Sequence, residues 1–436
     1  MQKNLHTVYS DSLAPGVALT CVNTDKFKTG CLLVYFVGKL NRDTASSFAL
    51  LPQVLRRGSS EFPDMERIAA ALDELYGARI EPIVRKKGEL HCIGFYADFP
   101  DDRFIPGGES VLEKTIDLAS GIIQSPYMQS GLLRSDYIES EKNNLIDDIR
   151  AGINDKRNYS IDRLVEEMCA EETYGVHGLG DIGRVSAITP ESLTGTYRDI
   201  LAKPLIEILY CGSAGPERVA SALRLALGGL PQRVDMTVPE TNVVLYPKSS
   251  PPRRITEELD VVQGKLAIGF RLGKAMKGIP NYPALMVFNA IYGASDTSKL
   301  FLTVRERYSL CYSISSMIEK HKGVMLVTSG VDFSNCETAL DEILAQLDLV
   351  KKGSIGDLEL LTAKRAVVTA IKTTMDRPAG LLDFYFDSRV SAARYDPNEL
   401  CDSVEAITID DVVEAASEVQ PDTIYLLTGK GGGLDG

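Results

Sequence analysis

Residues 44–59, TASSFALLPQVLRRGS, are the stretch around which the rest of the chain can be organised. Their apolar residues recur at intervals of three and four, as on one face of an α-helix: Phe48, Leu51, Val54 and Leu55. Asp43 or Thr44 is suited to cap the start of this helix, and Gly58 to stop it. The stretch therefore predicts a buried helix with an abrupt end.

The same order of elements occurs twice in the chain. The β-rich run GCLLVYFVGK at 30–39 leads into the helix that stops at Gly58, and GKLAIGFRLGK at 264–274 leads into PNYPALMVFNAIY, which stops at Gly293. The triplet Ala-Ile-Thr then precedes a predicted helix at both 187–189 and 406–408. Self-similarity at this scale predicts a tandem duplication of one unit. The expected fold class is α+β, with two homologous domains, each a mostly antiparallel sheet with helices packed on one side.

The boundaries follow from the repeat and from composition. We expect an N-terminal domain at 1–232, a linker at 233–252 that is rich in proline and turn residues, and a C-terminal domain at 253–430. Residues 431–436 are mostly glycine and predict a flexible tail. With 436 residues, the chain is long enough for two hydrophobic cores.

Charge and cysteine usage exclude several classes of function. The formal net charge of −13 argues against nucleic acid or an anionic membrane as a partner. The eight cysteines lie mostly within apolar runs and form no C-x-x-C pair, as expected of free thiols in a reducing compartment. The N-terminus has no apolar run of signal-peptide type, and no apolar stretch is long enough to span a membrane. We therefore expect a cytoplasmic protein.

Residues 49–59 resemble the inverted zinc motif of the pitrilysin and mitochondrial processing peptidase family, in which His-x-x-Glu-His precedes a Gly-Ser or Gly-Thr turn. Alignment on Gly58 places Ala49 and Gln53 at the two histidine positions and Pro52 at the position of the general-base glutamate. Alanine and proline offer zinc no ligand, and a glutamine amide is a poor one. The resemblance places the third ligand at Asp148, which alone does not make a metal site and which reads more simply as a solvated helix residue. We expect no bound metal and no other cofactor.

In the same family the second half of the chain supplies an Arg and a Tyr, seven residues apart, that reach the substrate near the zinc site. TSKLFLTVRERYSLCYSISS, at 297–316, resembles that motif and places Arg305 and Tyr312 at the two positions. A guanidinium can bind a carbonyl or carboxylate through two donors, and a phenol can donate to a developing oxyanion. The structural alternative is that Arg305 pairs with Glu306 or Asp296 on the surface and that Tyr312 is half-buried on a strand.

The resemblance also concerns the strand to which active members add their substrate. Its counterpart is ARIEPIVRK, at 78–86, where Pro82 cannot donate to a β-ladder and Glu81 adds charge. The resemblance therefore implies half of a clamshell, not catalytic alone, that supplies Arg305 and Tyr312 to a partner subunit carrying His-x-x-Glu-His and acting on a peptide or small protein. The alternatives are a structural or peptide-binding scaffold without a catalytic contribution and a hydrolase with a different site, for which the sequence shows no nucleophile elbow.

Overall fold

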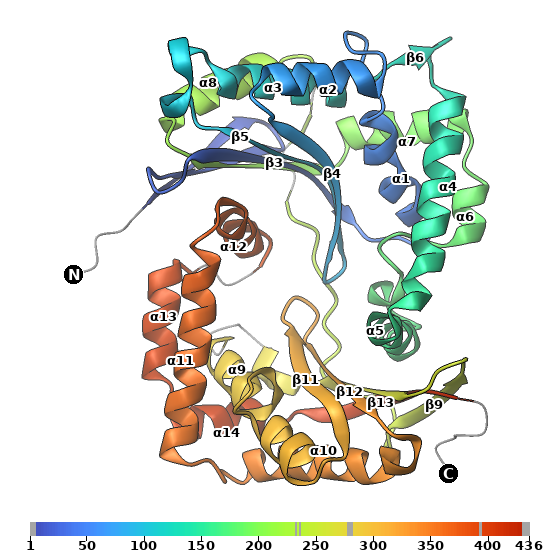
Figure 1. The fold of residues 1–436 in the computed structure, drawn as a ribbon, viewed down its shortest axis with the longest axis vertical. Coiled ribbons are helices and arrows are strands. Elements are labelled where there is room, and N and C mark those ends of the chain that lie inside the picture. The colour runs from blue at the N-terminus through green and yellow to red at the C-terminus, as the bar shows by residue number, and fades with distance from the viewer. Residues whose placement is uncertain (1–5, 232, 235–236, 277–281, 392–394, 430–436) are drawn as a thin grey trace. The chain divides into compact units, whose positions relative to one another are not determined.

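The computed structural model describes residues 6–231, 233–234, 237–276, 282–391 and 395–429. These residues form two compact units, and neither unit is continuous in sequence (Figure 1). The first unit combines 6–150 with Val176–Glu240 and Thr374–Val390. The second unit combines Ala151–Gly175 with Thr241–Thr373 and 391–429. In the described part of the predicted linker, 233–234 and 237–252, there is neither helix nor strand. The predicted tail, 431–436, lies outside the described residues.

The first unit is built on a six-stranded sheet in the order β1-β2-β8-β3-β5-β4. Strands β2 and β8 are parallel, and the other neighbours are antiparallel. The strands are β1 (Thr7–Ala14), β2 (Val17–Asn23), β3 (Thr29–Lys39), β4 (Arg79–Lys87), β5 (Leu90–Pro100) and β8 (Leu205–Gly212). A separate short hairpin joins β6 (Met128–Gln129) to β7 (Leu132–Leu133).

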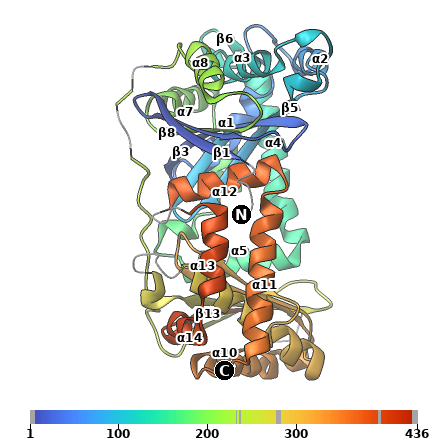
Figure 2. The same cartoon turned by 90° about the vertical axis from the view of Figure 1, so that its left-hand side faces the viewer.

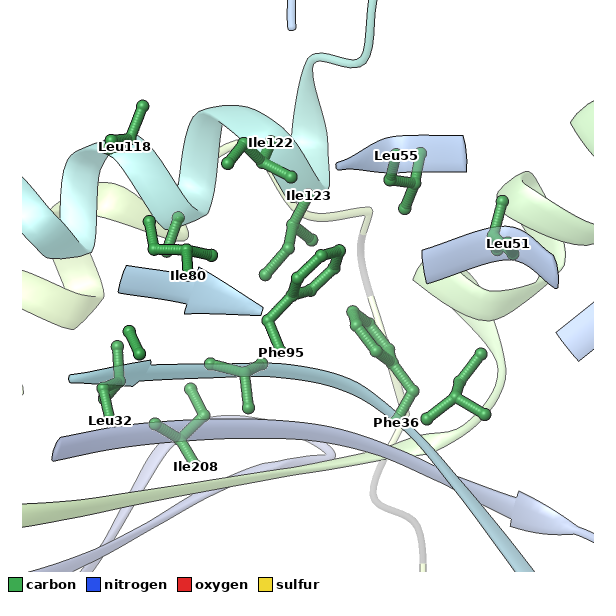
Figure 3. Close-up of a cluster of buried hydrophobic side chains, with 14 of the residues drawn as sticks. Leu32, Phe36, Leu51, Leu55, Ile80, Phe95, Leu118, Ile122, Ile123 and Ile208 are labelled. Carbon is green, nitrogen blue, oxygen red and sulfur yellow. The ribbon is translucent and has the colours of Figure 1, made fainter. Parts of the chain in front are cut away.

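The uninterrupted apolar run in β3 is explained by burial of both faces of the sheet. Leu32, Val34 and Phe36 point into one hydrophobic cluster, whereas Leu33 and Tyr35 point into another. Because side chains alternate along a strand, a strand covered on both sides needs apolar residues at every position. Figure 3 shows Leu32 and Phe36 in the first cluster, close to side chains from neighbouring strands and helices.

One face of this sheet is covered by helices from the N-terminal part of the chain. The helices of this part are α1 (Ala45–Leu55), α2 (Met65–Glu74), α3 (Val111–Gln124), α4 (Ser135–Ala151), α6 (Ile182–Ser186), α7 (Pro190–Ala202) and α8 (Pro216–Ala226). Helix α1 buries the predicted residues Leu51, Val54 and Leu55, whereas the fourth, Phe48, is half-buried. Gly58 follows the end of α1 where the backbone passes so close to the Pro63 carbonyl that a Cβ atom would collide with it. The predicted helix and its abrupt stop are confirmed.

The other face is covered by a helix from the C-terminal half of the sequence, α12 (Pro378–Val390), which Figure 2 shows lying across the strands. Its buried residues are spaced so that they share one side of the helix: Leu381, Leu382, Tyr385 and Phe386. The Phe386 and Tyr35 rings lie 4.4 Å apart, and Arg389 donates at 3.0 Å to the fully buried carboxylate of Glu207 on β8. This helix therefore belongs to the core of the first unit.

The second unit contains a five-stranded sheet in the order β11-β12-β10-β13-β9. Its strands are β9 (Arg253–Glu258), β10 (Gly264–Arg271), β11 (Cys311–Glu319), β12 (Val324–Val331) and β13 (Gln420–Thr428). Strands β13 and β9 are parallel, and the other neighbours are antiparallel. The sequence of pairings matches that of β4, β5, β3, β8 and β2 in the first unit, which confirms two homologous domains of α+β class.

Helices pack on both faces of this second sheet, as they do on the first, and not on one side only as expected from the sequence. The helices are α5 (Lys156–Met168), α9 (Tyr282–Asn289), α10 (Cys336–Lys351), α11 (Asp357–Thr374), α13 (Pro397–Ala406) and α14 (Ile409–Ser417), with π-helical turns η6 (Ala290–Ala294) and η7 (Leu300–Arg307). Figure 1 shows α5 on one face of the sheet and α10 and α14 on the other. Leu164 and Met168 of α5 pack against Ala267 of β10 and Leu427 of β13. Among the described residues, every helix is too short or too polar to cross a bilayer.

Candidate functional site

The helix that occupies the place of the zinc motif, α1, is a core element of the first unit. Ala49 is 1 % exposed, Pro52 is buried and Gln53 is half-buried. Pro52 lies inside the helix, where its ring nitrogen has no hydrogen to donate to the Phe48 carbonyl. Leu51 and Leu55 of the same helix point into the hydrophobic cluster drawn in Figure 3. These residues do not fit a zinc ion, because the two ligand positions offer a methyl group and an amide.

The third position of the zinc motif is on α4, and it faces solvent. Asp148 is exposed. Two helical turns earlier, the buried carboxylate of Glu141 accepts hydrogen bonds from Arg57 at 3.1 Å and from Asn144 at 3.0 Å. An ion pair thus ties the end of α1 to α4. Within the described residues, no group of three or more His, Cys, Asp or Glu side chains is arranged to hold a metal ion.

Arg305 lies in the last turn of η7, near the surface of the second unit. Its side chain is 40 % exposed, its guanidinium lies 4.6 Å from the centroid of the Phe301 ring, and its Nε is 3.5 Å from the Glu306 carboxylate. The pairing with Glu306 is the one named by the structural alternative. An exposed pair at this distance contributes little to stability, so the guanidinium can exchange Glu306 for another anion or carbonyl at small cost.

Tyr312 lies near the start of β11, the edge strand of its sheet. It is 63 % exposed, and its hydroxyl group is 3.3 Å from each carboxylate oxygen of Asp332. The side chain is therefore more accessible than the half-buried position of the structural alternative. A phenol that donates to a carboxylate at the surface can donate equally to a carbonyl oxygen of a bound molecule.

The structure brings the two residues to the same end of β11. Burial raises the pKa of the Cys311 thiol, and the positive charge of Arg305 opposes that shift. The backbone shows the same neighbourhood, because η7 ends only a few residues before β11 begins. Arg305 and Tyr312 therefore lie on adjoining elements of the second unit, which the hydrogen bond from the Leu310 N–H group to the Val304 carbonyl, at 3.0 Å, joins between them.

The strand expected to be a poor docking edge is indeed an edge strand. β4 is the last strand of its sheet, and Pro82 lies opposite Phe95 of β5. Since proline has no N–H group, β4 presents an interrupted row of donors. Its counterpart in the second unit, β11, reads CYSISSMIE and contains no proline.

A buried charge cluster in the second unit was not predicted from the sequence. Arg271 of β10 donates to Glu172 and, at 2.8 Å, to Asp422 of β13, while the Lys322 ammonium is 2.7 Å from Glu172. All four side chains are at most 10 % exposed. Burial raises the pKa of Glu172, but hydrogen bonds from Arg271 and Lys322 outweigh this and hold the pKa below its ordinary value. The available signal was an arginine at the end of the largely apolar run GKLAIGFR.

Restoring the motif by Ala49→His, Pro52→Glu and Gln53→His is expected to yield no metal-dependent peptidase activity in the isolated chain. Ala49 has no room for an imidazole ring in a packed core, and Asp148 is one methylene shorter than the glutamate it replaces. Zinc content by elemental analysis and peptide hydrolysis with and without a chelator test this expectation. Turnover by the triple variant alone that is lost on chelation would contradict it.

Comparison with known proteins agrees with this geometry. Residues 187–367 match the model described as Peptidase M16 inactive domain. The chain is 32 % identical over 417 residues to a Bacillus subtilis protein named probable inactive metalloprotease YmfF, covering 96 % of this chain and 97 % of the relative. It is 25 % identical over 294 residues to the B. subtilis antilisterial bacteriocin subtilosin biosynthesis protein AlbE, covering 65 % of this chain and 69 % of the relative.

A solved structure has the same fold. The crystal structure of a conserved protein from Enterococcus faecalis V583 superposes with a TM-score of 0.87 and 26 % identity, covering 98 % of this chain and all of the other. Likeness over nearly the whole length, together with zinc-motif positions that cannot bind zinc, leads to one conclusion: the chain belongs to the M16 peptidase family, that of pitrilysin and the mitochondrial processing peptidases, and is one of its non-catalytic members.

Proposed function

We propose that this chain is the substrate-holding subunit of a heterodimeric zinc metallopeptidase and supplies Arg305 and Tyr312 to the zinc site of a catalytic partner. The observation that carries the proposal is the accessibility of both side chains. Among the described residues, Arg305 is held by an exposed ion pair and a ring contact, and Tyr312 donates from an exposed position on the edge strand of its sheet. A scaffold has no need of a guanidinium and a phenol at the same strand end.

The proposed partner carries the intact His-x-x-Glu-His helix, and the substrate is a peptide or small protein. In such a pair the partner provides zinc, the metal-bound water and the general base, whereas this chain provides donors for the peptide carbonyl. Relatedness to a protein named for the biosynthesis of a bacteriocin supports action on a defined substrate. The net charge of −13 argues against nucleic acid. The eight buried thiols support a reducing, cytoplasmic location.

Co-purification tests the pairing. The tagged full-length chain is expressed in its own organism at native level, captured, and its companions are identified by mass spectrometry. We expect one abundant companion of M16 type that contains His-x-x-Glu-His and brings about one zinc ion per heterodimer. Capture of the chain only as a homodimer, or with companions lacking that motif, would contradict the proposal and favour the scaffold function.

A further inference from the structure

The second unit contains a pocket of about 130 Å³ between the first turn of α5 and the sheet. Two cationic side chains line it, Arg157 and Lys265. The hydroxyl groups of Ser313, Ser315 and Thr328 also line it. A cavity of this size is well above the volume of about 30 Å³ that one water molecule takes up in the liquid. It therefore has room for a polyatomic anion.

The strand register explains how these side chains come together. Lys265 of β10 lies opposite Gly330 of β12, and Gly330 lies opposite Ser313 of β11. Two residues along, Thr328 lies opposite Ser315. Since positions two apart share a face, all these groups point to the same side of the sheet. Gly330 keeps the middle of the row open, because a Cβ atom there would lie 3.1 Å from both Ser313 Oγ and Gln263 Oε1.

The two cations face one another across the hydroxyl groups. Arg157 Nη2 donates to Ser315 Oγ at 2.8 Å, and Ser315 Oγ is 3.4 Å from Thr328 Oγ1. Lys265 Nζ donates to Gln263 Oε1 at 2.6 Å, which leaves it two further hydrogens. Burial, and then the charge of Arg157, lower the pKa of Lys265. The two positive charges thus repel each other.

One carboxylate belongs to the same neighbourhood. The negative charge of Asp155 opposes the lowering of the Lys265 pKa, because it favours the protonated ammonium. Its side chain also accepts hydrogen bonds from the backbone N–H groups of Arg157 and Asn158, both at 3.1 Å, as the N-cap of α5. These two hydrogen bonds hold the Asp155 carboxylate at the N-terminus of α5. The lining of the pocket itself remains cationic in a chain of strongly negative net charge.

We propose that this pocket binds the phosphate group of a small phosphate ester. A guanidinium, an ammonium and three hydroxyl groups, two from β11 and one from β12, provide more donors than the two oxygens of a carboxylate can accept. They suit the three terminal oxygens and the near-double charge of a phosphate monoester. The negative charge of the anion relieves the repulsion between Arg157 and Lys265. Its oxygens accept hydrogen bonds from the hydroxyl groups of the two serines and of Thr328. This inference is independent of the proposed peptidase role, because Arg305 and Tyr312 take no part in it.

Isothermal titration calorimetry of the full-length chain with inorganic phosphate tests the assignment. We expect saturable binding that falls about tenfold or more in the double variant Arg157→Gln/Lys265→Gln, since each charge-assisted hydrogen bond contributes more than a neutral one. The matched control is Arg254→Gln/Lys352→Gln, which removes the same net charge at exposed positions of the same unit and should bind as the wild type does.

A single variant and a second anion complete the test. Arg157→Gln alone alters an exposed residue in the first turn of α5 and should fold normally, so its weaker binding separates loss of the site from loss of structure. Sodium acetate at the same ionic strength should bind much more weakly than phosphate. Absence of saturable phosphate binding to the wild type, equal losses in the two double variants, or acetate binding as tight as phosphate would each overturn the proposal.

Discussion

Replacement of Glu172 by alanine is expected to lower the free energy of unfolding of the second unit by about 3 to 5 kcal/mol. The carboxylate contacts Arg271 and Lys322, and both cations are almost completely buried. Asp422 contacts Arg271 at 2.8 Å, but the variant deprives Lys322 of the carboxylate that lies 2.7 Å from it. Removing one member of a buried charge cluster costs more than its own hydrogen bonds, because the remaining charge stays desolvated.

The neighbouring residue provides a matched control for this measurement. Glu171 also forms an ion pair, with Lys248, but both side chains are largely exposed. Urea unfolding of Glu171→Ala should give nearly the wild-type midpoint, whereas Glu172→Ala should show a much lower midpoint. Equal midpoints for the two variants would mean that the buried cluster does not hold residues 151–175 in the second unit.

Acidification provides an independent check of the same cluster. The folded-state pKa of Glu172 is held below its ordinary value of 4.5, so its stabilising contribution is complete above about pH 4.5 and is lost as the pH falls through the folded-state pKa. The stability difference between wild type and Glu172→Gln should therefore be largest near neutral pH and shrink below pH 4.5. A difference that grows on acidification would have the wrong sign.

Tyr312→Phe is expected to reduce the activity of the reconstituted heterodimer by about 10² to 10³-fold without weakening its association. If the hydroxyl donates to a developing oxyanion, its removal costs about 2.7 to 4 kcal/mol of transition-state stabilisation. The substitution leaves the ring in place, and the hydrogen bond that it deletes within the chain is an exposed one to Asp332 at 3.3 Å. The stability of the second unit should accordingly change little.

Two neighbouring residues allow matched controls for the activity measurements. Tyr308→Phe removes another exposed phenol hydroxyl four residues earlier, and Arg307→Ala removes an exposed guanidinium at the end of η7. Both should leave the activity of the heterodimer close to that of the wild type, whereas Arg305→Ala should lower it. If Tyr312→Phe and Tyr308→Phe behave alike, the hydroxyl of Tyr312 has no special role.

Much of the architecture could be predicted because it depends on local spacing. The helix of residues 45–55 shows in the three-and-four spacing of its apolar residues, and the repeat of a β-rich run followed by a helix predicts two similar sheets. Each sheet then pairs its strands in the same order. The loss of zinc binding could also be predicted, since it needs only the side-chain chemistry of Ala49, Pro52 and Gln53.

Other features depend on contacts between distant segments, and these have no local signal. The residues of α12 show a buried helical face, but nothing in that pattern indicates that Phe386 packs on Tyr35 of β3, in a segment from the other end of the sequence. The phosphate pocket also has no local signal in the sequence, because Arg157, Lys265 and Ser313 come from three separate segments. The serines of β11 look unremarkable in sequence, and only the strand register places them beside Lys265.

The most direct test of the account is the rate of peptide hydrolysis by the zinc-bearing partner as this chain is added. The partner alone should be nearly inactive, and activity should rise with added chain and saturate at one equivalent. The double variant Arg305→Ala/Tyr312→Phe should still associate with the partner at one equivalent, as measured by analytical ultracentrifugation. The rate of hydrolysis by that complex should be lower by at least about 10²-fold. A partner that is fully active alone, or a double variant that activates as well as the wild type, would contradict a substrate-holding role.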